Sequence, residues 1–191
     1  MFDLQYQIDK LHNYSSSFAN LDTTTTYFSQ RDNYTMPHRT CNSSANAMYL
    51  DWLMAATTGK RLGGDDGYLR KVLSVGDTIY HENQTVALKS YGWNTVWNVV
   101  ANIREDRDIL RSLVCSGIPV VVNILHRGRL EAPRGGHIIL LCGWLSDSME
   151  WLAQDPYGSL RSDYQDSNGR LSRISGRQFN IRWQGGFRTL A

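Results

Sequence analysis

The stretch HRTCNSSANAMYLDWL, residues 38–53, decides how the rest of the chain is interpreted, because a cysteine stands at the start of a helical pattern. After Cys41, apolar side chains recur at the spacing of one helix face. They are Ala45, Met48, Tyr49, Trp52 and Leu53. Thr40 or Cys41 can act as the N-cap, and TTGKRLGG at residues 57–64 ends the pattern. We therefore predict an amphipathic helix that begins at Cys41.

A cysteine in this position can fill a core as a small apolar side chain, or it can serve chemistry as a thiolate. The unpaired N–H groups and the dipole of a helix start stabilise negative charge. A neighbouring imidazolium lowers the thiol pKa further, from about 8.5 to roughly 3.5–7.5. A nucleophilic thiolate also requires a base, a group that orients the base, and a donor for the oxyanion of acyl transfer.

Periodicity along the rest of the chain predicts an α+β fold. Three further segments have the helical period: residues 65–74, 83–92 and 102–115. Three later segments are predicted strands: residues 118–125, 137–144 and 149–155. Residues 126–136 are a predicted loop, and residues 166–190 form short strands and turns, or one short helix before a closing strand. Because helices precede strands, we expect the helices on one side of the sheet.

The length of 191 residues suits one domain with at most an appendage. A short helix is predicted within residues 1–14, followed by a polar connector. We therefore expect an N-terminal extension at residues 1–26 and the main domain at residues 27–191.

Composition excludes several classes of function. A net charge of +2, with no basic stripe interleaved with aromatic residues, argues against a nucleic-acid partner. No apolar run approaches the roughly 20 residues of a membrane span. The N-terminus lacks the pattern of a secretory signal, so synthesis in the cytoplasm is expected. Three separated cysteines and no HxxxH spacing predict neither a disulfide framework nor a zinc site, and no cofactor is expected. A monomer is expected.

Three residues suit the other parts of a thiolate site. His137 opens a buried strand after two glycines, and Asp155 follows eighteen residues later, at the end of the next predicted strand. Adjacent antiparallel strands would bring these two side chains together, with the carboxylate on an imidazole nitrogen. Gln30, eleven residues before Cys41, offers a side-chain amide as an oxyanion donor.

Each role has an alternative candidate. His126 also follows a buried strand and is the alternative base, although it opens the predicted loop. Asp147 could orient the base, but it lies in a predicted hairpin turn. Asn33 or Asn42 could donate to the oxyanion in place of Gln30.

The remaining cysteines and histidines are expected to have no chemical role. Cys115 and Cys142 lack partners in the pattern and are expected to fill space. The other histidines are expected to be exposed: His12, His38 and His81. One tryptophan is expected to shield the catalytic histidine from water, and the sequence does not indicate which one.

The segment QRDNYTMPHRTCNSSANAMYL (residues 30–50) resembles the opening motif of the C39-like cysteine peptidases, which are related to bacteriocin-leader peptidases. GGHIILLCGW (residues 135–144) and DPYG (residues 155–158) resemble the histidine and aspartate motifs of the same family. The resemblance implies a papain-like fold, with the nucleophile helix packed against a mostly antiparallel C-terminal sheet. It also implies that Cys41 is the nucleophile, His137 the base, Asp155 its orienting acid and Gln30 the oxyanion donor.

The expected function is cysteine-dependent hydrolysis of peptide bonds. Small size and a mildly basic composition favour a lysin-type enzyme that degrades peptidoglycan. Such an enzyme could be encoded by a phage, and it would be released to the cell wall. An intracellular processing peptidase and a transglutaminase-like acyl transferase are alternatives on the same fold. A non-enzymatic binding module is disfavoured, because such a module has no physical need for all three triad residues.

Overall fold

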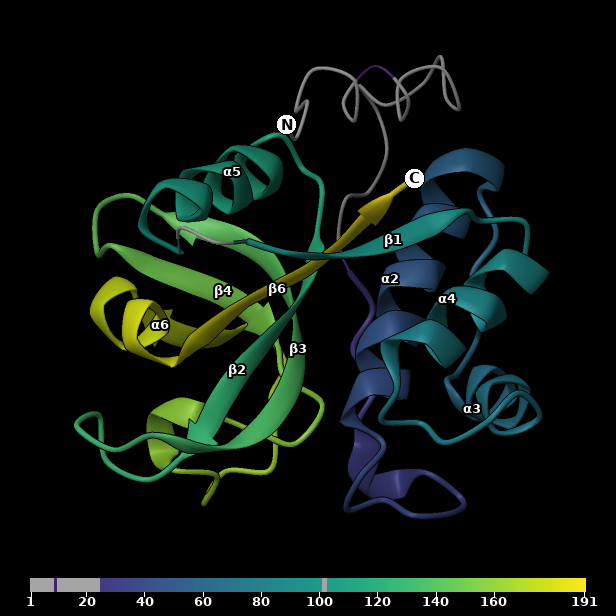
Figure 1. Ribbon diagram of the computed structural model, residues 1–191, viewed down its shortest axis with the longest axis horizontal. Helices are drawn as coiled ribbons and strands as arrows, with labels where there is room; N and C mark the ends of the chain where they lie inside the picture. Colours follow the sequence, from purple (N-terminus) through teal and green to yellow (C-terminus); the bar gives the residue numbers. More distant parts are fainter. Residues whose placement is uncertain (1–8, 10–24, 101–102) are drawn as a thin grey trace.

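The computed structural model describes residue 9 and residues 25–100 and 103–191. The predicted helix within residues 1–14 therefore falls almost entirely outside the described residues. The described chain contains a six-stranded sheet with the strand order β1-β6-β2-β3-β4-β5, and every neighbouring pair is antiparallel (Figure 1). The strands are β1 Thr95–Val99, β2 Val120–Arg127, β3 Arg134–Leu145, β4 Glu150–Gln154, β5 Ser172–Ser175 and β6 Trp183–Leu190.

The remaining regular structure is helical, and the helices pack against the sheet. They are α2 Cys41–Thr58, α3 Asp66–Leu73, α4 His81–Ser90, α5 Ile103–Cys115 and α6 Gly176–Arg182, with short 3-10 turns η2 Gln30–Asp32 and η3 Leu160–Ser162. The predicted α+β class is confirmed, with the Cys41 helix packed on β3 of an antiparallel sheet.

Helix α2 begins at Cys41 as predicted and ends where Gly59 adopts a left-handed conformation, with its N–H donating to the Ala55 carbonyl at 3.1 Å. The prediction of an amphipathic helix was wrong, because α2 is buried on nearly all sides. Its polar side chains are hydrogen-bonded inside the protein. Asp51, for example, accepts from the Leu62 N–H at 2.6 Å and from Arg61 Nη1 at 2.9 Å.

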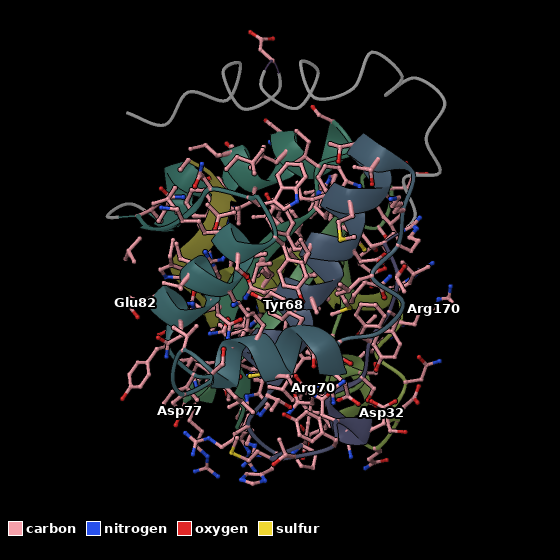
Figure 2. All side chains as sticks on the ribbon, turned by 90° about the vertical axis from the view of Figure 1, so that its right-hand side faces the viewer. Asp32, Tyr68, Arg70, Asp77, Glu82 and Arg170 are labelled. Carbon is pink, nitrogen blue, oxygen red and sulfur yellow. The ribbon has the colours of Figure 1, made fainter. Side chains whose placement is uncertain are left out.

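The helices do not lie on one side of the sheet, which corrects the prediction of a single helical layer. Figure 1 shows α2, α3 and α4 on the right of the sheet and α5 and α6 on its left. Strands β2 and β3 are consequently buried on both faces, as their unbroken apolar sequences predict. Figure 2 looks onto the α3 and α4 side, where Tyr68 is buried and Asp77 and Glu82 lie at the outer edge.

Two features of the sheet differ from the sequence prediction. Strand β1 precedes α5 and was not predicted, and it pairs with the last strand, β6, from Thr95↔Leu190 to Val99↔Gly186. Strand β2 runs to Arg127 and β3 starts at Arg134, so His126 lies in a strand and not in a loop. Pairing of Arg127 with Arg134 extends both strands beyond their apolar runs. The α6–β6 unit matches the predicted short helix before a closing strand.

Within residues 25–100 and 103–191, no helix is long and apolar enough to cross a membrane, and no cluster of three or more His, Cys, Asp or Glu side chains could hold a metal ion.

Candidate active site

Three elements bring Cys41, His137 and Asp155 together. Cys41 is the first residue of α2, His137 lies in β3, and Asp155 directly follows β4. The β3–β4 pairing of Leu140 with Gln154 places the end of β4 beside the first half of β3. Because α2 packs across β3, its N-terminus faces the same point of the sheet.

The thiol of Cys41 lies close enough to the His137 imidazole for the two groups to interact, and both side chains line one cleft. Burial tends to raise the pKa of Cys41, but the His137 hydrogen bond and charge, together with a hydrogen bond from the Ile138 backbone, lower it below the ordinary thiol value. Thr40, the N-cap residue, makes no side-chain capping bond to the helix. The N–H groups of the first turn therefore remain available beside the sulfur.

The imidazole of His137 is held from its far side by Asp155. Its Nε2 donates to Asp155 Oδ1 at 2.7 Å, and both side chains are buried. This bond leaves the other ring nitrogen for Cys41. Burial alone would lower the pKa of His137, but the charge and hydrogen bond of Asp155, with a smaller effect of Cys41, raise it to about 10. A thiolate–imidazolium pair is thus the favoured ionisation state.

The carboxylate of Asp155 is fully hydrogen-bonded. Oδ1 also accepts from the Tyr157 N–H at 2.9 Å, and Oδ2 accepts from the Tyr164 hydroxyl at 3.1 Å. Burial and the negative charge of Asp155 raise the pKa of Tyr164, so its hydroxyl remains a donor. These bonds hold the carboxylate in place beside His137.

The aromatic rings of one histidine and two tyrosines enclose the His137–Asp155 pair. The ring of His126 lies 4.7 Å from that of His137, and Tyr157 and Tyr164 present their edges to His137 at 6.2 Å. Tyr157 stands two residues after Asp155 within DPYG, so its position was a signal in the sequence. No pattern pointed to Tyr164.

The alternative base, His126, is close to the site, yet its nitrogens are occupied. Nδ1 lies 2.7 Å from the Gly135 carbonyl, and Arg127 Nε donates to Nε2 at 3.1 Å. Burial and the neighbouring charge of His137 lower the pKa of His126 to about 4. His126 is therefore neutral, with one fixed tautomer. The alternative acid, Asp147, is exposed in the β3–β4 turn, as the hairpin prediction indicated.

The three amide candidates for the oxyanion differ in what they already bind. Asn33 is buried at the start of α2, and hydrogen bonds with the hydroxyls of Thr40 and Ser44 occupy its side-chain amide. Asn42 donates to the Ile79 carbonyl and accepts from Asn46.

Gln30 is buried and donates one Nε2 hydrogen to the Pro37 carbonyl at 2.7 Å. Its Oε1 has no partner among residues 25–100 and 103–191. The Gln30 N–H donates to the Pro156 carbonyl at 2.8 Å, which ties η2 to the Asp155 loop. An amide nitrogen carries two hydrogens, so one Nε2 hydrogen of Gln30 is not used by the Pro37 carbonyl.

Cys41 and His137 open into a cleft of about 360 Å³ between the helical side and the sheet. Its apolar walls include Ile79, Ile124 and Ile138. His81 also lines it, which corrects the prediction that this side chain is solvent-exposed. The His81 ring stacks on Trp97 with 3.5 Å between ring centres, and burial together with the charge of Arg188 lowers its pKa to about 4.

A sequence model described as the Peptidase C39 like family matches residues 23–185. The chain belongs to this family. It is accordingly a cysteine peptidase, as the resemblance of its three motifs implied. No curated protein matches the chain significantly.

Among solved structures, the C39-like chain is similar to the peptidase domain of Streptococcus ComA, a bi-functional ABC transporter involved in a quorum-sensing pathway. The two share 18% identity with a TM-score of 0.55, over 88% of this chain and 98% of that domain. This likeness establishes the C39 peptidase fold.

The other two cysteines of this C39-like chain lie away from the site. Cys142 is half-buried in β3, where burial raises its thiol pKa to about 11. Cys115 is exposed at the end of α5, so it does not fill the core as predicted.

Proposed function

We propose that this protein hydrolyses peptide bonds with Cys41 as nucleophile, His137 as general base and acid, and Asp155 as the residue that orients His137. The observation that carries the proposal is the chain of contacts at the start of α2. The Cys41 thiol meets one side of the His137 ring, while the other side donates to Asp155 at 2.7 Å. A buried cysteine that only filled space would require neither neighbour.

The proposed reaction uses each group in turn. The Cys41 thiolate attacks the peptide carbonyl, and the oxyanion accepts from the Cys41 N–H and from the second Nε2 hydrogen of Gln30. The His137 imidazolium then gives its proton to the leaving amine, and a thioester to Cys41 remains. Water, deprotonated by His137, attacks the thioester and releases the carboxylate product.

For the substrate, we propose cell-wall peptides, as in a lysin-type enzyme. The cleft between the helical side and the sheet has room for an extended peptide, and its walls carry few charges. A processing peptidase is the second candidate, and the fold shared with the peptidase domain of the transporter ComA favours it.

One experiment separates these functions. The purified protein is incubated with peptidoglycan and with a peptide library, in each case with and without an added amine. The products are identified by mass spectrometry. Release of wall peptides supports the lysin, cleavage in the library alone supports processing, and products joined to added amines indicate acyl transfer. Cys41→Ala should abolish all products and retain the circular dichroism spectrum, whereas Cys115→Ala should remain active. An active Cys41→Ala variant would exclude the mechanism.

A further inference from the structure

A second cavity lies directly behind the rings that enclose His137. It has a volume of about 480 Å³, and its lining includes Tyr157, Tyr164, Arg31 and Arg127. Tyr157 and Tyr164 are the residues that present their edges to His137. One layer of aromatic side chains therefore separates this cavity from the proposed catalytic imidazole.

Strand β2 connects the two cavities. Residues 123–125 line the cleft that contains Cys41, and Arg127 and Gly128 line the second cavity. His126 lies between them and packs on His137. A strand advances about 3.3 Å per residue, so Leu125 at the cleft and Arg127 at the second cavity are roughly 7 Å apart along β2, the length of about two residues of an extended peptide.

Both arginines of this cavity are anchored through Nε. Arg31 Nε donates to the Tyr157 carbonyl at 2.6 Å, and its guanidinium lies over the Tyr157 ring, 4.1 Å from the ring centre. Arg127 Nε donates to His126 Nε2 at 3.1 Å. Among the described residues, neither guanidinium forms an ion pair, and the terminal amino groups of both remain without a hydrogen bond. Terminal amino groups held in this way match the two oxygens of a carboxylate.

The charge around the cavity is positive. Asp163 also lines it and forms no ion pair with either arginine in the described chain, so the lining carries two positive charges and one negative. The adjacent β2–β3 hairpin adds Arg129 and Arg134, against Glu131. An anion that enters the cavity therefore meets a favourable field.

We propose that this cavity, the Arg31–Arg127 pocket, binds a carboxylate of the substrate. The proposal rests on the proposed function and deepens it, because it assigns the enzyme to peptides that carry an acidic group within a few residues of the scissile bond. The carboxylate can belong to an aspartate or glutamate side chain or to a free C-terminus. Both occur in wall peptides and in precursor peptides.

The test is a set of matched peptides around a cleavage site found in the library. In the first series, each pair carries Glu or Gln at one position, and this position is moved along the peptide. In the second series, each pair has either a free C-terminus or its amide. We expect the wild type to prefer one acidic member by about tenfold in kcat/KM, and the pair that shows it identifies the source of the carboxylate. Arg31→Gln and Arg127→Gln should each reduce this ratio severalfold, whereas Arg129→Gln, outside the pocket, should retain it. Equal rates for all pairs would overturn the proposal.

A binding measurement tests the pocket even if no peptide is cleaved. The Nε–H signals of Arg31 and Arg127 are followed by NMR in the Cys41→Ala variant during titration with N-acetylglutamate or with N-acetylglutaminamide, an amide that carries no carboxylate. We expect saturable shifts with the acid and none with the amide. Such shifts, together with no cleavage of any library peptide by the wild-type protein, would support the pocket and reject the proposed hydrolysis. Identical responses to the two compounds would reject the pocket.

Discussion

The reactivity of Cys41 depends on which of two opposing effects on its thiol is larger. Burial disfavours the thiolate, whereas the His137 imidazolium and the Ile138 backbone stabilise it, and the second effect prevails. For Cys142, burial dominates and the pKa rises to about 11. The two thiols share one chemistry and differ in their neighbours. Because only the thiolate attacks an electrophile, this difference can be measured directly.

We expect iodoacetamide to label Cys41 much faster than Cys142 at neutral pH. Because the pKa of Cys142 is raised to about 11, very little of it is thiolate at pH 7, whereas the pKa of Cys41 is lowered; this difference should outweigh the lower intrinsic nucleophilicity of a low-pKa thiol. Mass spectrometry of peptides at successive times gives the three rates. The exposed Cys115 supplies the reference for an accessible thiol. Labelling of all three at one rate would show that Cys41 is not activated.

The activity should depend on pH through the Cys41–His137 pair. The thiolate–imidazolium state exists above the lowered pKa of Cys41 and below the pKa of His137, about 10. We therefore expect kcat/KM to rise with pH at values below the ordinary thiol pKa, and to fall near pH 10. Asp155→Asn removes the main influence that raises the His137 pKa, so the alkaline limb should move to lower pH.

The same Asp155→Asn variant should also lose activity, on the order of 10²-fold, because the base is no longer held in place. The pH–rate profiles of the two proteins, measured with one peptide substrate, give both quantities. An unchanged alkaline limb would contradict the assignment of Asp155 as the partner of His137.

At the scale of elements, the crossing of β1, β6 and β2 supports one wall of the cleft. Gly186 in β6 packs so closely that a Cβ there would lie 2.5 Å from Trp97 Cζ2 and 2.8 Å from Asn123 Oδ1. Trp97 carries the stacked ring of His81, and both His81 and Asn123 line the cleft. Gly186, which lies outside the proposed triad, thus allows the close packing that positions Trp97 and Asn123 in this wall of the cleft.

We expect Gly186→Ala to destabilise the protein by about 1–3 kcal/mol, the usual cost of overpacking a rigid site. It should also lower kcat/KM, because Trp97 and Asn123 must move. Urea denaturation monitored by tryptophan fluorescence measures the free energy of unfolding. Gly67→Ala is the matched control: a Cβ at this second residue of α3 meets nothing within 4 Å, so the stability should change by no more than about 0.5 kcal/mol. Equal effects at both positions would contradict the close packing.

At the scale of the whole molecule, buried polar contacts add to the shared apolar core in holding the helical side against the sheet. Arg188 of β6 is 1% exposed, and its guanidinium donates to Thr85 and Thr95 at 2.8 Å and to the His81 carbonyl at 3.0 Å. These bonds join β6 and β1 to α4. Burial lowers the pKa of Arg188, which means that keeping its charged guanidinium inside the protein costs desolvation free energy.

Arg188→Ala should destabilise the protein by about 3 kcal/mol, because it leaves several buried acceptors unpaired and opens a cavity. For a domain of this size, Tm should fall by roughly 6–12 °C, which scanning calorimetry measures. Arg111→Ala removes an arginine whose partner, Asp108, is exposed, and should change the stability by no more than about 0.5 kcal/mol. A Tm for Arg188→Ala close to that of Arg111→Ala would show that this network does not stabilise the fold.

Local patterns in the chain were sufficient to predict several elements. The start of α2 at Cys41, the end of α5 at Cys115 and the adjacent strands that carry His137 and Asp155 follow from periodicity and spacing. Each depends on residues close together along the chain, where backbone geometry controls which side chains share a face. The family resemblance rested on these same local motifs.

Tertiary contacts, several of them between residues distant along the chain, decided the rest. Residue 95 pairs with residue 190, His126 continues β2 because Arg127 meets Arg134, and Tyr164 reaches Asp155 from a separate loop. The burial of α2 on nearly all sides and the anchoring of Arg31 on Tyr157 likewise require partners distant in sequence. The local sequence pattern around a residue predicts which face of a helix or strand its side chain occupies. Its pKa and its free hydrogen-bonding groups depend on which distant atoms exclude water from it, and only the folded chain specifies those atoms.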